Sequence, residues 1–177
     1  MTALTPPRLA IVMMGVSGNG KSTIGAALAA ALGLPFIEGD TLHSAHNIEK
    51  MSRGLPLDDA DRAPWLAAIA ARLADTTRYP RGLVITCSAL KASYRQRLRC
   101  ADASVRFVFL DAPESVIGQR LALRTHHFMP ASLLSSQFQT LEHPRGESDV
   151  LTVDASGSIE HTLQAVLRAV TASAAQP

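Results

Sequence analysis

Residues 15–22, Gly-Val-Ser-Gly-Asn-Gly-Lys-Ser, constrain the fold of this chain more than any other stretch. They match the pattern G-x-x-x-x-G-K-[ST] at every fixed position. The apolar run Leu9–Met14 precedes them and has the length and β-branching of a buried parallel strand. An Ala- and Leu-rich stretch at 22–32 follows and ends at Gly33, as a helix with a C-terminal glycine does. Strand, glycine-rich loop and helix in this order predict a phosphate-binding loop.

The residue types of this loop suit a nucleoside triphosphate. Glycines let backbone N–H groups turn toward phosphate oxygens, and the helix N-terminus adds partial positive charge at the same point. The Lys21 ammonium is expected to reach the β- and γ-phosphates and the Ser22 hydroxyl to bind Mg²⁺. The predicted nucleotide-binding residues of the loop are Gly15, Val16, Ser17, Gly18, Asn19, Gly20, Lys21, Ser22 and Thr23.

The other apolar segments alternate between strand and helix patterns, which predicts a parallel sheet with helices on both faces. Strands are expected at 9–14, 35–38, 83–87, 105–110 and 150–154, and helices at 22–32, 43–53, 60–76, 91–99, from Pro113 through Arg120, 131–141 and 159–170. The break at 125–130 is typical of a mobile lid. We therefore predict one domain, 1–177, with a three-layer α/β/α phosphate-loop fold and a five-stranded parallel sheet. It includes a substrate-binding helical region at about 43–78 and a helical lid at about 120–142.

Composition excludes several functions. A hydrophobic fraction of 47% with 18% charged residues indicates a compact domain. The net charge of +2 and the scattered Lys and Arg favour neither nucleic-acid nor membrane binding. No run reaches membrane-spanning length, residues 1–7 lack the features of a signal peptide, and neither cysteine belongs to a C-x-x-C pair. We expect a cytoplasmic protein without a disulfide or zinc site, with Cys87 as a small core or cleft residue.

Phosphate loops serve motors, GTPases, ATPases and small-molecule kinases, so the fold alone does not select the function. This chain is too short for a motor with a mechanical domain. It lacks the Asn-Lys-x-Asp segment by which GTPases recognise guanine, and no apolar strand leads into an Asp-Glu pair of the ATPase type. These absences favour a compact phosphotransferase.

Three runs of residues then become informative. The first is Gly39-Asp40-x-x-His43-x-x-x-Asn47-x-x-Lys50-Met51-x-x-Gly54-x-Pro56-Leu57-x-Asp59-x-Asp61-Arg62-x-Pro64-Trp65-Leu66. The others are Cys87-Ser88-Ala89-Leu90-Lys91-x-x-Tyr94-Arg95 and His127-Phe128-Met129-Pro130 with Leu133-Leu134-x-Ser136-Gln137-Phe138. Over about 9–170 the chain resembles gluconate kinases, which are related to shikimate and adenylate kinases. The resemblance implies ATP-dependent phosphorylation of D-gluconate to 6-phosphogluconate, usually by a cytoplasmic homodimer.

Asp40 directly follows the second predicted strand, where open α/β sheets bind ligands. We expect its carboxylate to accept the proton of the attacking hydroxyl and to contact Mg²⁺ through water. A solvated turn residue or helix cap is the alternative role. Asp111 also follows an apolar strand, but the nearby Pro113 favours a helix cap for it.

A gluconate site needs positive charge for the carboxylate and hydrogen-bonding groups for the hydroxyls. His43, Asn47 and Lys50 are spaced by four and three residues and therefore share one helical face. The carboxylate candidates, which the sequence does not rank, are Lys50, Arg53, Arg62, Lys91 and Arg95. Surface ion pairs are the alternative role for each cation, and a packed structural role is the alternative for His43.

Arg120 and Arg124 lie one helical turn apart before the predicted lid. The resemblance implies that Arg120 stacks on adenine and that Arg124 holds the transferring phosphoryl group, which completes a catalytic set with Asp40 and Lys21. Solvent-facing helix charges are the alternative. Trp65 is expected to be a core anchor. Two rival functions remain, a kinase for another sugar acid or shikimate and an ATP-binding regulatory module without turnover.

Overall fold

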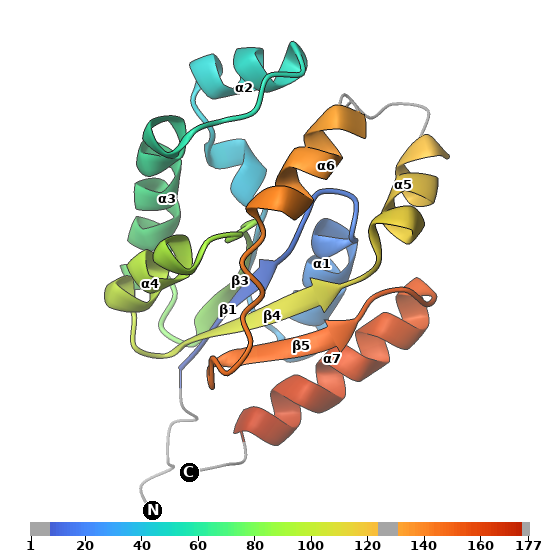
Figure 1. Ribbon diagram of the computed structural model, residues 1–177. Helices are drawn as coiled ribbons and strands as arrows, with labels where there is room; N and C mark the ends of the chain where they lie inside the picture. The colour runs from blue at the N-terminus through green and yellow to red at the C-terminus, as the bar shows by residue number, and fades with distance from the viewer. Residues whose placement is uncertain (1–7, 124–130, 175–177) are drawn as a thin grey trace, which may run out of the picture.

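The computed structural model describes residues 8–123 and 131–174. They contain a five-stranded parallel sheet with the order β2-β3-β1-β4-β5 (Figure 1). The strands are β1 (Leu9–Met14), β2 (Phe36–Ile37), β3 (Gly82–Thr86), β4 (Val105–Asp111) and β5 (Val150–Asp154). Every residue of β3 is buried, because both faces of a central parallel strand are covered. The predicted sheet is confirmed.

The helices are α1 (Lys21–Leu32), α2 (Ala45–Ser52), α3 (Asp59–Ala74), α4 (Ala92–Ala101), α5 (Glu114–Ala122), α6 (Ala131–Thr140) and α7 (Ile159–Ala174), with a 3-10 turn at Gly39–Leu42. Alternate strand residues face two apolar cores, one packed with α3 and α4 and the other with α1 and α7. Figure 1 shows α3 and α4 on one side of the sheet and α1 and α7 on the other. The three-layer α/β/α fold is confirmed.

Local signals explain the helix ends that lie near the site. Asp58 caps α3, since its carboxylate accepts from the Asp61 N–H while the Asp61 side chain accepts from the Asp58 N–H. The predicted cap at Asp111 is wrong. β4 continues through Asp111, which pairs with Asp154 of β5, and Pro113 occupies the N-cap position of α5 without a side-chain bond.

Parallel strands deliver their following loops to one edge of the sheet. At this edge β1 runs into the phosphate loop, β2 into the 3-10 turn Gly39–Leu42, and β3 into the turn at 87–91. The fold therefore gathers the predicted site segments at the carboxyl edge. No helix within 8–123 and 131–174 has the length and apolar character needed to cross a membrane.

Candidate active site

The phosphate loop is a backbone structure that depends on glycine. Gly15, Gly18 and Gly20 have φ angles of 128°, 83° and 95°, a backbone region that residues other than glycine rarely adopt. The Gly15 N–H donates to the carbonyl oxygen of Ser88 at 3.1 Å. The loop therefore begins against the turn that follows β3.

Two side chains brace this loop from within. Asn19 is 1% exposed, and its Nδ2 donates to the carbonyl oxygen of Leu110 at 2.9 Å, which ties the loop to β4. The Lys21 Nζ donates to the carbonyl oxygens of Gly15 at 3.0 Å and Val16 at 2.8 Å. The ammonium therefore lies within the curve of the loop, where it complements phosphate charge.

Ser22 and Thr23 occupy the first turn of α1, and both are exposed. Their hydroxyls lie at the positive end of the helix. A hydroxyl at this place is a hard oxygen ligand of the kind that Mg²⁺ prefers. The Ser22 side chain therefore fits the metal-binding role that the loop pattern predicts.

Gly39 fixes the backbone next to Asp40. Its N–H donates to Thr86 Oγ1 at 2.8 Å, and its carbonyl oxygen accepts from Trp65 Nε1 at 2.8 Å. A Cβ at this position would lie 1.8 Å from the carbonyl oxygen of Thr86, so only glycine fits. Trp65 is 2% exposed, which confirms it as a core anchor. The exposed Asp40 side chain projects from this pinned backbone.

His43 combines a packed position with proximity to charged groups. Its ring stacks on Trp65 with the centroids 4.3 Å apart and the planes at 11°. Burial lowers the pKa of His43, the Asp40 carboxylate raises it, and Arg62 lowers it further. Asn47 Nδ2 lies 3.3 Å from His43 Nδ1, and because an amide nitrogen only donates, Nδ1 accepts and the proton of the neutral ring is on Nε2.

Three charged candidates act electrostatically on Cys87, the residue directly after β3. Burial raises the pKa of the Cys87 thiol to about 12, and the charges of Lys21, Asp40 and Arg62 all act on it as smaller influences. Cys87 is 1% exposed, as expected of a core residue. The phosphate loop, the turn after β2 and α3 thus each contribute one charge that acts on this thiol, an ammonium, a carboxylate and a guanidinium.

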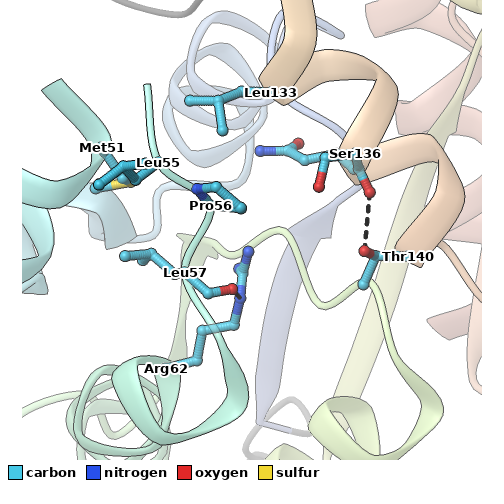
Figure 2. A pocket seen from close by; sticks show the side chains of 9 residues that line it. Met51, Leu55, Pro56, Leu57, Arg62, Leu133, Ser136 and Thr140 are labelled. Carbon is cyan, nitrogen blue, oxygen red and sulfur yellow. Dashed lines mark hydrogen bonds between the residues drawn. The ribbon is translucent and has the colours of Figure 1, made fainter. Parts of the chain in front are cut away.

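A cleft lies between α6 and the segment that joins α2 to α3 (Figure 2). Its lining consists of Met51, Leu55, Pro56, Leu57, Arg62, Leu133, Ser136, Gln137 and Thr140. The Arg62 Nε donates to the carbonyl oxygen of Leu57 at 3.3 Å. Neither terminal nitrogen of Arg62 donates to another residue of 8–123 or 131–174. Arg62 therefore offers two unoccupied nitrogens to a carboxylate ligand.

The other polar candidates of this region hold helices together. Asn47 is 3% exposed and donates through Nδ2 to the carbonyl oxygen of Asp61 at 2.8 Å, which joins α2 to α3. Three of the basic candidates form ion pairs outside the lining of the cleft. The pairs are Lys50–Asp61 at 2.5 Å, Arg53–Glu49 at 2.5 Å and Lys91–Asp59 at 2.7 Å.

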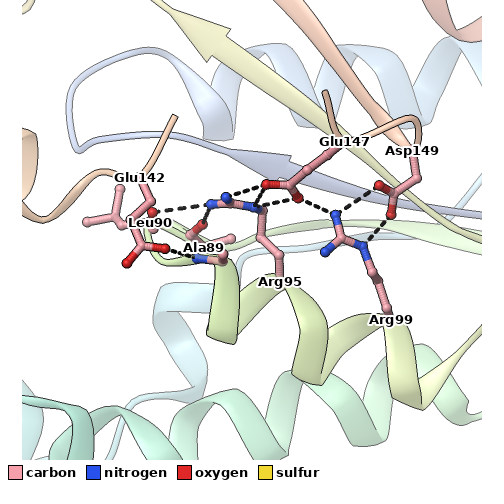
Figure 3. A network of polar contacts seen from close by, with 8 residues as sticks. Ala89, Leu90, Arg95, Arg99, Glu142, Glu147 and Asp149 are labelled. Carbon is pink, nitrogen blue, oxygen red and sulfur yellow. Dashed lines mark hydrogen bonds and ion pairs between the residues drawn. The ribbon is translucent and has the colours of Figure 1, made fainter. Parts of the chain in front are cut away.

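Arg95, the remaining carboxylate candidate, is held in contacts within the protein, and its binding of gluconate stays a prediction. It is 1% exposed, and it donates through Nη2 and Nε to the Glu147 carboxylate at 2.6 and 2.9 Å (Figure 3). Its Nη1 donates to the carbonyl oxygens of Ala89 at 2.9 Å and Leu90 at 3.2 Å. Ala89 has a φ of 46°, which is rare outside glycine. The guanidinium therefore stabilises a strained turn after β3.

Arg120 lies against the loop between β5 and α7. Its guanidinium donates to the carbonyl oxygens of Ala155 at 2.6 Å and Gly157 at 2.7 Å. Stacking of Arg120 on adenine stays a prediction. Arg124 and residues 124–130 of the predicted lid lie outside the described residues, and α6 belongs to the part of that range that the structure describes.

Sequence reasoning assigned no role to Gln137, which contacts the phosphate loop. Its Oε1 accepts from the Ser17 N–H at 2.7 Å. The available signal was its place in a run that resembles the gluconate kinases. The partner lies 120 residues away, so no local pattern indicates the contact.

Comparisons with known proteins agree with this geometry. A family model described as an AAA domain matches residues 11–144. The gluconokinase of Gluconobacter oxydans is 48% identical over 158 residues, which cover 89% of each chain. A crystal structure of a gluconokinase from Sinorhizobium meliloti aligns with a TM-score of 0.87 at 49% identity and covers 95% of each chain.

A shikimate kinase from Aquifex aeolicus, 20% identical, aligns with a TM-score of 0.62 over 96% of this chain and shows the shared fold alone. The gluconokinases match at more than twice that identity and over nearly the whole of their own length. This chain therefore belongs to the gluconokinase family.

Proposed function

We propose that this protein transfers the γ-phosphoryl group of ATP to the terminal hydroxyl of D-gluconate, which yields 6-phosphogluconate and ADP. The observation that carries the proposal is a phosphate loop that encloses the Lys21 ammonium, at the sheet edge where Asp40 follows β2 and next to a cleft that Arg62 lines. The names of the relatives that cover most of the chain support the same acceptor. A regulatory module that only binds ATP needs no carboxylate at this point.

The phosphate loop fits ATP and Mg²⁺. Its glycines supply the positive φ angles that the loop backbone requires, and the Lys21 ammonium lies within the loop. Mg²⁺ would be held by the exposed Ser22 hydroxyl and, through water, by Asp40. When bound, the ion neutralises charge on the phosphates. Arg120 is proposed to stack on adenine and Arg124 to bind the transferring phosphoryl group.

In the proposed reaction Asp40 accepts the proton of the attacking hydroxyl. The hydroxyl oxygen forms a bond to the γ-phosphorus while the bond to the β,γ-bridging oxygen breaks, and ADP leaves. Arg62 binds the gluconate carboxylate through its two terminal nitrogens, and the His43 Nε2–H donates to a hydroxyl. Lys21 stabilises negative charge on the phosphates. The pinned backbone at Gly39 keeps Asp40 in position for this step.

Several further assignments belong to the same proposal. The protein acts in the cytoplasm as a homodimer, on small molecules rather than nucleic acid or membranes. Its single domain holds the acceptor through the region at about 43–78 and covers the phosphates with the lid at about 120–142. Lid closure excludes water, so phosphoryl transfer is favoured over ATP hydrolysis.

An acceptor panel tests the proposal. The protein is incubated with ATP, Mg²⁺ and D-gluconate, shikimate, other sugar acids or nucleoside monophosphates, and ADP release is followed while products are identified by mass spectrometry. Gluconate-dependent ADP release with formation of 6-phosphogluconate is expected. If ATP binds and no acceptor raises ADP release, the regulatory module becomes the better account.

Two variants test the assigned residues. Asp40→Asn should retain ATP binding and lose about 10²- to 10⁴-fold in kcat, because the general base is gone. Arg62→Ala should raise KM for gluconate, whereas Arg53→Ala, which removes an exposed cation paired with Glu49, should leave KM unchanged. Equal KM values for the two arginine variants would remove Arg62 from the gluconate site.

A further inference from the structure

Helix α6 forms the wall between the phosphate loop and the acceptor cleft. Four of its residues recur at helical spacing and line the cleft, namely Leu133, Ser136, Gln137 and Thr140 (Figure 2). Leu134 and Phe138, on its other side, pack into the core that α1 and α7 share. This packing fixes the rotation of α6 about its axis and therefore the direction of Gln137.

The contact with the phosphate loop orients the Gln137 carboxamide. Its Oε1 accepts from the Ser17 N–H at an N-to-O distance of 2.7 Å. A backbone N–H only donates, so the atom that faces the loop is the oxygen, and the Nε2 hydrogens remain for another acceptor. Nε2 donates to none of the residues at 8–123 and 131–174. The carboxamide therefore offers an unused donor beside the loop.

Gln137 contacts the phosphate loop and lines the cleft, the donor and acceptor sites of the proposed reaction. The phosphoryl group starts on the phosphate loop, which includes Ser17, and is accepted in the cleft, whose wall includes Gln137. Its non-bridging oxygens carry negative charge and accept strong hydrogen bonds. Because Oε1 is already held by the loop, the Nε2 donor is preorganised, which is the property that makes such donors effective in catalysis.

We propose that Gln137 is a catalytic residue, whose Nε2 donates to an oxygen of the transferring phosphoryl group while Oε1 stays bonded to the Ser17 N–H. This role rests on the proposed kinase function and adds a residue to its phosphoryl site. It also gives the described part of the lid a chemical role, since α6 carries the donor.

Two substitutions separate this role from a structural one. Gln137→Glu keeps the shape and an oxygen for the Ser17 N–H, but it removes the donor and adds negative charge beside the phosphates. Gln137→Ala removes both groups. Both variants should lose about 10²-fold or more in kcat, with thermal midpoint and KM for gluconate near wild type. Gln139→Ala, an exposed glutamine of the same helix, is the matched control and should keep the wild-type kcat.

The possible results are distinguishable. If the wild type is active and Gln137→Glu keeps the wild-type kcat, this inference is refuted but the proposed function is not. If the wild type phosphorylates no acceptor, both the proposed function and this inference are refuted. ATP affinity, measured by calorimetric titration without acceptor, adds a third result. Tighter ATP binding by Gln137→Ala at unchanged kcat would mean that Oε1 merely occupies the Ser17 N–H until phosphate replaces it, which also refutes the role. If Gln137→Ala does not fold, Gln137→Glu decides.

Discussion

Replacing Arg95 by methionine tests whether this guanidinium stabilises the fold or binds substrate. Methionine retains an apolar stem but leaves the Glu147 carboxylate without its bidentate partner. It also leaves the carbonyl oxygens of Ala89 and Leu90 without these donors. Breaking a buried ion pair by removing one partner costs about 3–5 kcal/mol. Glu147 keeps Arg99 as a second partner, so we expect the lower end, about 3 kcal/mol.

This loss is measurable as a change in the thermal midpoint. In a domain of this size 1 kcal/mol corresponds to about 2–4 °C, so the midpoint should fall by about 6–12 °C in differential scanning calorimetry. Arg97→Met, at an exposed position of the same helix, is the matched control and should stay close to wild type. At a temperature where Arg95→Met is folded, its KM for gluconate should be unchanged.

The opposite pattern would refute the reasoning. An unchanged midpoint together with a raised KM for gluconate would place Arg95 in the substrate site. A double-mutant cycle with Glu147→Gln gives an independent check. Direct partners should show a coupling energy of at least about 1 kcal/mol, whereas residues that act separately should be additive within about 0.5 kcal/mol.

Gly39→Ala should destabilise the protein by about 3 kcal/mol or more in urea denaturation, because the new Cβ would lie 1.8 Å from the carbonyl oxygen of Thr86; a cost below about 1 kcal/mol would contradict this packing. Burial lowers the pKa of His43, so the unfolded chain binds the proton more readily, and His43 contributes stability that is present above about pH 6.5 and is lost as the pH falls through the lower folded pKa. His43→Gln should therefore flatten the fall of the urea midpoint below that pH. Cys100 is exposed and should react with a thiol reagent in the native protein, whereas Cys87, whose pKa burial raises to about 12, should react only in denaturant. Reaction of both thiols at the same rate in the native protein would contradict the burial of Cys87.

The fold was predictable because its signals are local. Each strand of a covered parallel sheet is an apolar run, so β1, β3, β4 and β5 stand out along the chain. Helix ends at Gly33 and Asp58 follow from backbone chemistry that neighbouring residues reveal. Asp111 was assigned wrongly because a strand end and a helix cap both place an Asp before a Pro, and only the pairing with β5 distinguishes them.

Site residues divide according to what determines their position. Loop and turn residues such as Lys21 and Asp40 follow strands. The order of the strands in the sheet brings them to the same edge, independently of the contacts that their side chains make. The ion-pair partners of long basic side chains are determined by tertiary contacts. Lys91 pairs with a carboxylate 32 residues away in the sequence and Arg95 with one 52 residues away. The helical spacing of residues in the sequence indicates neither partner.

The same distinction explains why the choice of Arg62 among the carboxylate candidates, and any role for Gln137, emerge only from the three-dimensional arrangement. Both lie on amphipathic helices, where the sequence pattern predicts that a polar side chain at the edge of the apolar face is exposed to solvent. Their orientation is set by packing on the opposite side of each helix, by Trp65 and Leu66 on α3 and by Leu134 on α6. The two helices thereby turn a guanidinium and a carboxamide toward one cleft. Apolar contacts far from the phosphates thus decide which polar groups are available to the acceptor.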